Sequence, residues 1–259
     1  MPCHARLLRG KAWTERRRIF VIFLSLFHLA IAIVRARCSA FNASAAFPLD
    51  SRKDMAMAHD ILAIGAHPDD IELGCGGSLA KLAFAGARIH ALVLSRGGRG
   101  CHDGADRSDE SHRALRQLGV RQVLQHDFPD TCFPSCRNDI ISALEQACDA
   151  IRPQRVYTMC GEDHHQDHRT VHEASIVACR SVPQILCYES PSTLPQFAPQ
   201  VFEDISVQLE LKIRALREHA SQGDRHYMQE SHLRCHAQFR GQQVGIGPSE
   251  GFLPHRLVL

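Results

Sequence analysis

The chain has 259 residues, of which 44% are hydrophobic and 22% are charged, and its formal net charge is +2. These values are typical of a globular chain with one domain of roughly 200 residues plus an extension, and a near-balanced charge gives no reason to expect a nucleic-acid-binding protein. The eleven cysteines are scattered and lack the C-x-x-C spacing of a zinc knuckle. They favour reduced thiols, and hence a cytoplasmic protein, over a disulfide framework.

Residues 1–55 form an N-terminal extension ahead of the first convincing strand. It carries a basic segment followed by an apolar run over residues 19–34, which is shorter than the roughly 20 residues that span a bilayer. Three interpretations stay open: an over-long start with Met55 or Met57 as the true first residue, a cleaved secretory signal, and a membrane anchor. We expect this extension to lie outside the fold, and residues 56–259 to form one domain.

Short apolar runs and amphipathic segments alternate along the rest of the chain. The sequence predicts strands over residues 61–66, 88–94, 122–125, 155–159 and 184–188. It predicts helices over residues 71–85, 108–118, 140–151, 170–181, 205–219 and 226–239. Such alternation is typical of βαβ units, so we expect a three-layer α/β domain, Rossmann-like, with a mostly parallel sheet and helices on both of its faces.

The stretch His67-Pro68-Asp69-Asp70 directly follows the first predicted strand. A dinucleotide fingerprint does not explain it, because the glycines of 74-GCGG-77 have the wrong spacing and start too late. A helix N-cap would explain one aspartate but not the histidine. A histidine and two carboxylates at the tip of a buried strand therefore indicate a chemical site.

A second polar cluster, 160-CGEDHHQDHRTVH-172, follows the fourth predicted strand. Because ligands bind beyond the carboxyl ends of parallel strands, we expect the two clusters to meet at one edge of the sheet. Within the second cluster His164, His168 and His172 are spaced to share one helical face, and a solvated histidine-rich helix end is the alternative.

Aspartate and histidine together suit a divalent metal such as Zn²⁺, and Fe²⁺ or Co²⁺ would fit the same ligand types. One carboxylate and two imidazoles would leave a place for water at the ion. A second carboxylate beside the ion could then accept the proton of that water. The pattern therefore predicts a metal-assisted hydrolase.

The A-H-P-D-D motif, the following G-x-G-G and the downstream H-x-D-H resemble the LmbE-like (PIG-L) N-acetylglucosamine de-N-acetylases, over about residues 61–259. This resemblance implies that His67, Asp70 and His168 are the zinc ligands and that Asp69 is the general base. It implies that His165 protonates the leaving amine or stabilises the oxyanion, and that Asp167 orients His165 by a hydrogen bond. Arg107 and Asp130 match positions near the sugar pocket, whereas a surface ion pair with Glu110 is the alternative for Arg107.

The resemblance further implies the reaction and the partners. We expect a zinc-dependent hydrolase that removes the N-acetyl group from a GlcNAc-type sugar or sugar conjugate. A homo-oligomer is compatible with the family, and membrane contact is expected only if the apolar run over residues 19–34 is a functional signal. A metal phosphoesterase and a non-catalytic sugar- or metal-binding protein of the same fold stay open as alternatives.

Overall fold

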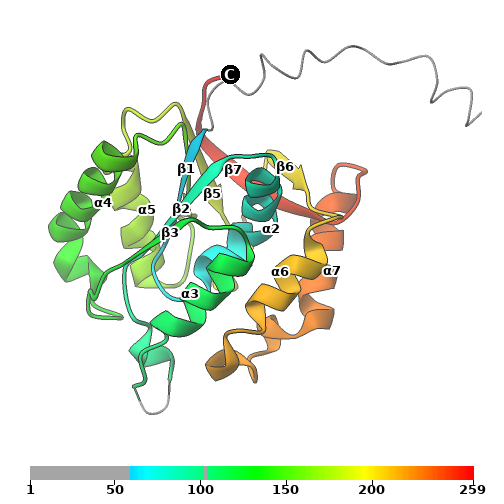
Figure 1. Ribbon diagram of the computed structural model, residues 1–259, viewed down its shortest axis with the longest axis horizontal. Coiled ribbons are helices and arrows are strands. Elements are labelled where there is room, and N and C mark those ends of the chain that lie inside the picture. Colours follow the sequence, from blue (N-terminus) through cyan, green and yellow to red (C-terminus); the bar gives the residue numbers. More distant parts are fainter. Residues whose placement is uncertain (1–58, 102–103) are drawn as a thin grey trace, which may run out of the picture. The chain divides into compact units, whose positions relative to one another are not determined.

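The computed structural model describes residues 59–101 and 104–259, which make up one compact unit (Figure 1). The predicted extension over residues 1–55 and both candidate start methionines lie outside the described residues. In the part of the chain that is described, none of the helices combines the length and the apolar character that a membrane crossing requires.

The predicted alternation of strands and helices is present. The strands are β1 (Asp60–Gly65), β2 (Arg88–Val93), β3 (Gln122–Gln125), β4 (Arg155–Met159), β5 (Gln184–Tyr188), β6 (Val201–Asp204) and β7 (Ser249–Leu257). The α-helices are α2 (Asp70–Phe84), α3 (Ser108–Gln117), α4 (Arg137–Ile151), α5 (Gln166–Ala178), α6 (Leu209–Leu216) and α7 (Glu230–Gln242). Short 3₁₀ turns include η1 (Gly98–Gly100), η3 (Ala220–Gln222) and η4 (His226–Met228).

The strands form a single sheet in the order β3-β2-β1-β4-β5-β7-β6. The five strands from β3 to β5 are mutually parallel, and β7 pairs antiparallel with both β5 and β6. The prediction of a mostly parallel sheet is therefore confirmed. The antiparallel edge was not predicted, because β7 carries Gly251 and Pro254, residues that interrupt a sequence pattern for strands.

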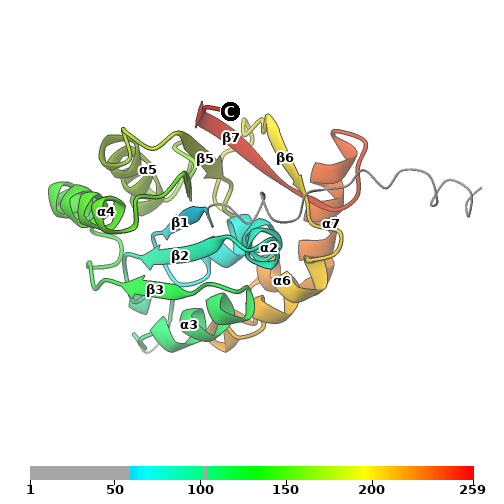
Figure 2. The ribbon, with the colours of Figure 1, turned by 45° about the horizontal axis from the view of Figure 1, so that its top comes forward.

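Helices cover both faces of the sheet (Figure 2). Helices α4 and α5 lie on one face, and α2, α3 and α6 lie on the other. The central strands supply the core, with Leu62, Ile64, Leu92 and Val156 fully buried. A sheet buried on both faces explains why these strands are continuous apolar runs rather than alternating ones.

Helix α5 begins earlier than its apolar spacing indicated. The helix predicted from residue 170 starts at Gln166, with His165 as its N-cap. The sequence pattern missed this first turn because its residues are polar, whereas helix periodicity is recognised from apolar positions. As a result Asp167 and His168 lie in the first turn of a rigid helix instead of a loop.

Candidate metal centre

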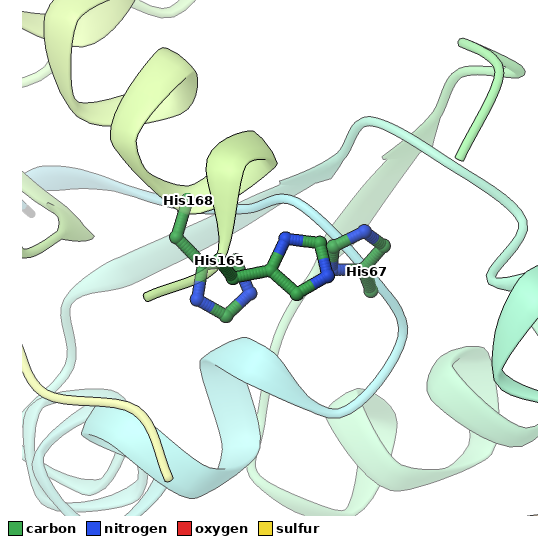
Figure 3. A group of neighbouring side chains, drawn as sticks. All are labelled: His67, His165 and His168. Atoms are coloured by element: carbon green, nitrogen blue, oxygen red, sulfur yellow. The ribbon is translucent and has the colours of Figure 1, made fainter. Parts of the chain in front are cut away.

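The two polar clusters meet at the carboxyl edge of the sheet. Strands β1 and β4 are parallel neighbours, with Ala63 opposite Tyr157, so the segments that follow them leave the sheet at the same edge. Strand β2 lies on one side of β1 and β4 lies on the other, so successive strands are added to the sheet in opposite directions from β1. Ligands of α/β proteins bind at such a switch point, which here lies between β1 and β4. One nitrogen each from His67, His165 and His168 lies within 4.8 Å of the others (Figure 3).

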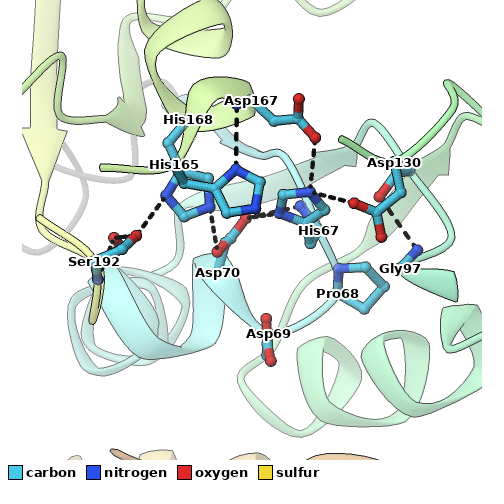
Figure 4. A network of polar contacts seen from close by, with 12 residues as sticks. His67, Pro68, Asp69, Asp70, Gly97, Asp130, His165, Asp167, His168 and Ser192 are labelled. Atoms are coloured by element: carbon cyan, nitrogen blue, oxygen red, sulfur yellow. Dashed lines mark hydrogen bonds and ion pairs between the residues drawn. The ribbon is translucent and has the colours of Figure 1, made fainter. Parts of the chain in front are cut away.

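His67 is held by carboxylates on both of its ring nitrogens. Its Nε2 lies 3.2 Å from Asp130 Oδ1 and 3.2 Å from Asp167 Oδ2 (Figure 4). Its Nδ1 lies 3.4 Å from Asp70 Oδ2. Burial disfavours the charged ring, but the hydrogen bonds with Asp130, Asp167 and Asp70 prevail and raise the pKa of His67 well above its usual value.

His168 shows the same arrangement on the other side of Asp70. Its Nδ1 lies 3.1 Å from Asp163 Oδ2, and its Nε2 lies 3.4 Å from Asp70 Oδ1. Asp163 in turn accepts hydrogen bonds from the hydroxyls of Ser190 and Ser192, each at 2.6 Å. The sequence analysis did not single out Asp163, although its place in the histidine-rich segment was the available signal.

The three predicted ligands therefore converge, and their donor chemistry fits a divalent ion. His67 and His168 each direct one nitrogen to a buried carboxylate and the other to Asp70, which is how a metal-ligating imidazole is usually oriented. In a tetrahedral zinc site with bonds of about 2.0–2.2 Å, neighbouring donors lie about 3.3–3.6 Å apart. The two 3.4 Å separations fall in that range, with His67 Nδ1 facing Asp70 Oδ2 and His168 Nε2 facing Asp70 Oδ1.

Asp70 is suited to this place by its charge. Burial alone would favour the neutral acid, but His168 and His67 lower the pKa of Asp70 far below its usual value. The carboxylate is therefore ionised and available as a ligand. His165 also lies within reach of His67 and His168, so the structure brings a third imidazole to the same centre.

Asp69 points to a different partner. Its backbone φ is 102°, a left-handed conformation that is uncommon outside glycine, and its side chain does not cap helix α2. Instead Arg107 Nη2 donates to Asp69 Oδ2 at 2.7 Å and to the Pro68 carbonyl at 2.6 Å. Burial raises the pKa of Asp69, and the positive charge of Arg107 opposes that rise. A strained backbone fixed in this way is typical of a functional position.

The contacts of Arg107 and Asp167 differ from those expected. Arg107 lies 4.0 Å from Glu110, and its shorter contact is the one with Asp69, so a surface ion pair does not describe it. The Asp167 carboxylate does not orient His165: it binds His67 and accepts hydrogen bonds from the backbone N–H groups of Thr131 and Phe133. The backbone N–H of Asp167, not its carboxylate, donates to His165 Nδ1.

That backbone contact decides the tautomer of His165. Because Nδ1 accepts a hydrogen bond, the neutral ring carries its proton on Nε2. Burial lowers the pKa of His165, and the neighbouring rings of His168 and His67 lower it further, so the neutral form is favoured. His165 is thus arranged as a hydrogen-bond donor through Nε2. Its stacking on His168, with ring centroids 4.5 Å apart, keeps it beside the centre.

The other two histidines of the predicted helical face lie apart from the centre. His164 is exposed, and His172 is bound through Nδ1 to the Met159 carbonyl at 3.0 Å. The even spacing of histidines was therefore not what marked the site.

A cleft of about 400 Å³ opens over the centre. Asp130 lines the cleft. Because its carboxylate contacts His67, we infer that Asp130 mainly orients that ring. Side chains from other segments complete the wall: Arg99, Gln222, Arg225, His226 and Tyr227. Polar and cationic groups around a concave site suit a hydroxyl-rich small molecule.

Comparison with known proteins gives consistent results. The model of the family PIG-L, described as GlcNAc-PI de-N-acetylase, matches residues 62–179. An uncharacterised deacetylase of Escherichia coli, YaiS, is 50% identical over 167 residues, covering 62% of this chain and 90% of that protein. The diacetylchitobiose deacetylase of Thermococcus kodakarensis is 30% identical over 224 residues, covering 75% of this chain and 83% of that protein.

A solved structure agrees with these relatives. The N,N'-diacetylchitobiose deacetylase of Pyrococcus horikoshii superposes with a TM-score of 0.65 at 25% identity, covering 83% of this chain and 91% of that one. Sequence and fold therefore point to the same group of proteins.

Proposed function

This chain belongs to the PIG-L family of deacetylases, and from that premise we propose that it is a metal-dependent hydrolase that removes the N-acetyl group from a GlcNAc-type sugar or sugar conjugate. The observation that carries the proposal is the convergence of His67, Asp70 and His168 from two distant segments, with Asp69 lining the same cleft. A site that only stores a metal has no need of that fourth, proton-accepting group.

The residues that would hold the ion are His67, Asp70 and His168. A zinc ion held by them would act as a Lewis acid toward the acetamide carbonyl and would bring the pKa of a water molecule beside it to about 7. The carboxylate of Asp167 holds the ring of His67, and that of Asp163 holds the ring of His168. The other ring nitrogens, Nδ1 of His67 and Nε2 of His168, therefore face Asp70 before any ion arrives.

Asp69 accepts the proton of the attacking water in this mechanism. Burial raises its pKa, which makes it a better proton acceptor than an ordinary surface aspartate, and the positive charge of Arg107 opposes that rise. Because Arg107 holds Oδ2, the other carboxylate oxygen is the one that takes the proton.

His165 stabilises the developing oxyanion through its Nε2–H. We assign it this role rather than that of the general acid. In a doubly protonated ring Nδ1 would also carry a hydrogen, and this donor would face the backbone N–H of Asp167, which is a donor too. The proton held by Asp69 passes to the sugar nitrogen as the carbon–nitrogen bond breaks. The products are acetic acid and the amine, and the proton of the acid then passes to the amine, which leaves acetate and the ammonium form of the sugar.

The test is acetate release by the purified full chain. The substrates would be N-acetylglucosamine, N,N'-diacetylchitobiose and larger N-acetylglucosamine conjugates, assayed after chelation and after reloading with Zn²⁺, Fe²⁺ or Co²⁺. We expect release that chelation abolishes and a divalent metal restores. Phosphate release from phosphate esters without acetate release would favour a phosphoesterase, and tight sugar binding without any turnover would favour a binding protein.

A further inference from the structure

A second cavity lies next to the metal cleft, and we call it the side cavity. It is bounded by segments of α2, α6, α7 and β7 and has a volume of about 70 Å³. Leu73, Pro191 and Tyr227 line both the side cavity and the cleft, so the two spaces are direct neighbours. A molecule held in the cleft can therefore place an attached group in the side cavity.

The buried charges in the wall of the side cavity are paired with each other. Lys212 Nζ donates to Glu250 Oε1 at 2.6 Å and to the Leu73 carbonyl at 2.6 Å. Glu250 also accepts hydrogen bonds from the backbone N–H groups of Gly77 and Ser78. These contacts leave neither buried charge in need of an ion from outside.

The remaining carboxylate and the hydroxyls of the wall are also engaged. Glu189 accepts from Arg240 Nε at 2.7 Å, and Nε2 of His236, which also lines the side cavity, lies 3.3 Å from the same carboxylate oxygen. Ser190 donates to Asp163, and Ser249 donates to the Gly247 carbonyl. Burial lowers the pKa of His232, so that ring is neutral near pH 7. The wall therefore offers no uncompensated charge among the residues that the structure describes.

Apolar side chains supply the rest of the surface, with Leu73, Pro191, Leu233 and Ala237 facing the side cavity. An ion that entered would lose its water without gaining a counter-charge, which is unfavourable, whereas an alkyl group would gain from burial. A water molecule needs about 10–15 Å³ of such space, so the side cavity has room for roughly five heavy atoms.

On the basis of the deacetylase function proposed above, we propose that the side cavity is a subsite for a small, uncharged, mainly apolar group on the conjugate partner of the N-acetyl sugar. The subsite selects among conjugates and takes no part in the chemistry. Tyr227 lines both spaces, so the bound conjugate would contact it where the conjugate extends from the cleft into the side cavity.

Three probes test this: N-acetylglucosamine, its n-butyl glycoside and its 3-carboxypropyl glycoside, which has similar length but ends in a carboxylate. Both anomers would be used with the zinc-loaded full chain, and both acetate release and the calorimetric Kd would be measured. We expect the butyl glycoside to exceed the carboxypropyl glycoside by about tenfold in kcat/KM and in affinity.

Matched variants on α7 locate the effect. Ala237→Leu fills the side cavity and should remove the butyl preference. Gln238→Leu adds the same side chain at the next, exposed position and should keep it. Should Ala237→Leu fail to fold, Leu233→Ala enlarges the side cavity and should shift the preference from the butyl to the n-hexyl glycoside.

The outcomes separate the two proposals. Acetate release with equal kcat/KM for the butyl and carboxypropyl probes would overturn the subsite and leave the deacetylase function standing. No acetate release from any probe, together with tighter butyl binding that Ala237→Leu abolishes, would overturn the function and support the subsite. Equal binding of both glycosides without turnover would overturn the subsite and the function alike.

Discussion

Arg107 donates a hydrogen bond of 2.7 Å to Asp69 although 38 residues separate them, and both side chains are more than nine-tenths buried. The contact ties the start of α3 to the tip of β1, where the chain has its strained φ of 102°. We infer that Arg107 positions Asp69. The same nitrogen, Nη2, also donates to the Pro68 carbonyl, so Arg107 fixes the backbone and the carboxylate together.

Arg107→Ala should lower kcat by about 100-fold, because a catalytic group displaced by about 1 Å loses that much rate. Zinc content should stay at one ion per chain, since the ligands are untouched. Arg107→Lys serves as the matched variant and should recover only part of the rate. Equal rates for wild type and Arg107→Ala would show that Asp69 is held by its other neighbours.

Asp69→Asn should lower kcat by about 10²–10⁴-fold, because the amide has the shape of the acid but cannot accept a proton. Metal content measured by atomic absorption should equal that of the wild type. The control is His164→Ala, which removes an exposed imidazole of the same segment and should leave the rate unchanged. A fully active Asp69→Asn enzyme would require another base.

Asp163→Ala should weaken zinc binding by about 10–100-fold, because His168 Nδ1 loses the carboxylate that orients the ring. Competition with a chromophoric chelator measures the affinity. Asp127→Ala removes a carboxylate that is mostly exposed and lies outside the centre, and it should bind zinc as the wild type does. Unchanged affinity in Asp163→Ala would mean that Ser192 alone suffices to hold His168.

Asp60 provides a pH-dependent contribution to stability away from the cleft. Its hydrogen bond with Arg88, aided by His90, lowers the pKa of Asp60 from 3.8 to about 2. A carboxyl whose pKa is depressed by folding stabilises the fold above the unfolded-state value and loses that effect as the pH falls toward the folded-state value. The difference in Tm between wild type and Asp60→Asn should therefore be constant above pH 5 and shrink between pH 4 and pH 2. A difference that does not change with pH would rule out this linkage.

Local pattern was enough to predict much of the fold. The strands β1 to β5 were all predicted, and three of them, β3, β4 and β5, have the predicted bounds. Strands β6 and β7 were missed because their own residues carry no clear alternation and because β7 pairs with β5 and β6, which lie far from it in the sequence. Pairing of that kind depends on the completed sheet.

The same division applies to the site. The sequence predicted His67, Asp69, Asp70, His165 and His168 as site residues, because polar residues at the tips of apolar strands are conspicuous there and because their motifs resemble a family. Which carboxylate orients which imidazole was decided only by the tertiary structure. Asp130 and Asp167 both reach His67, and Asp163 reaches His168, because the order of strands in the sheet and the early start of α5 bring them there. Residue type and spacing indicate which ligands a side chain is able to bind. Which neighbour it contacts depends on distances that are set only when the chain is packed.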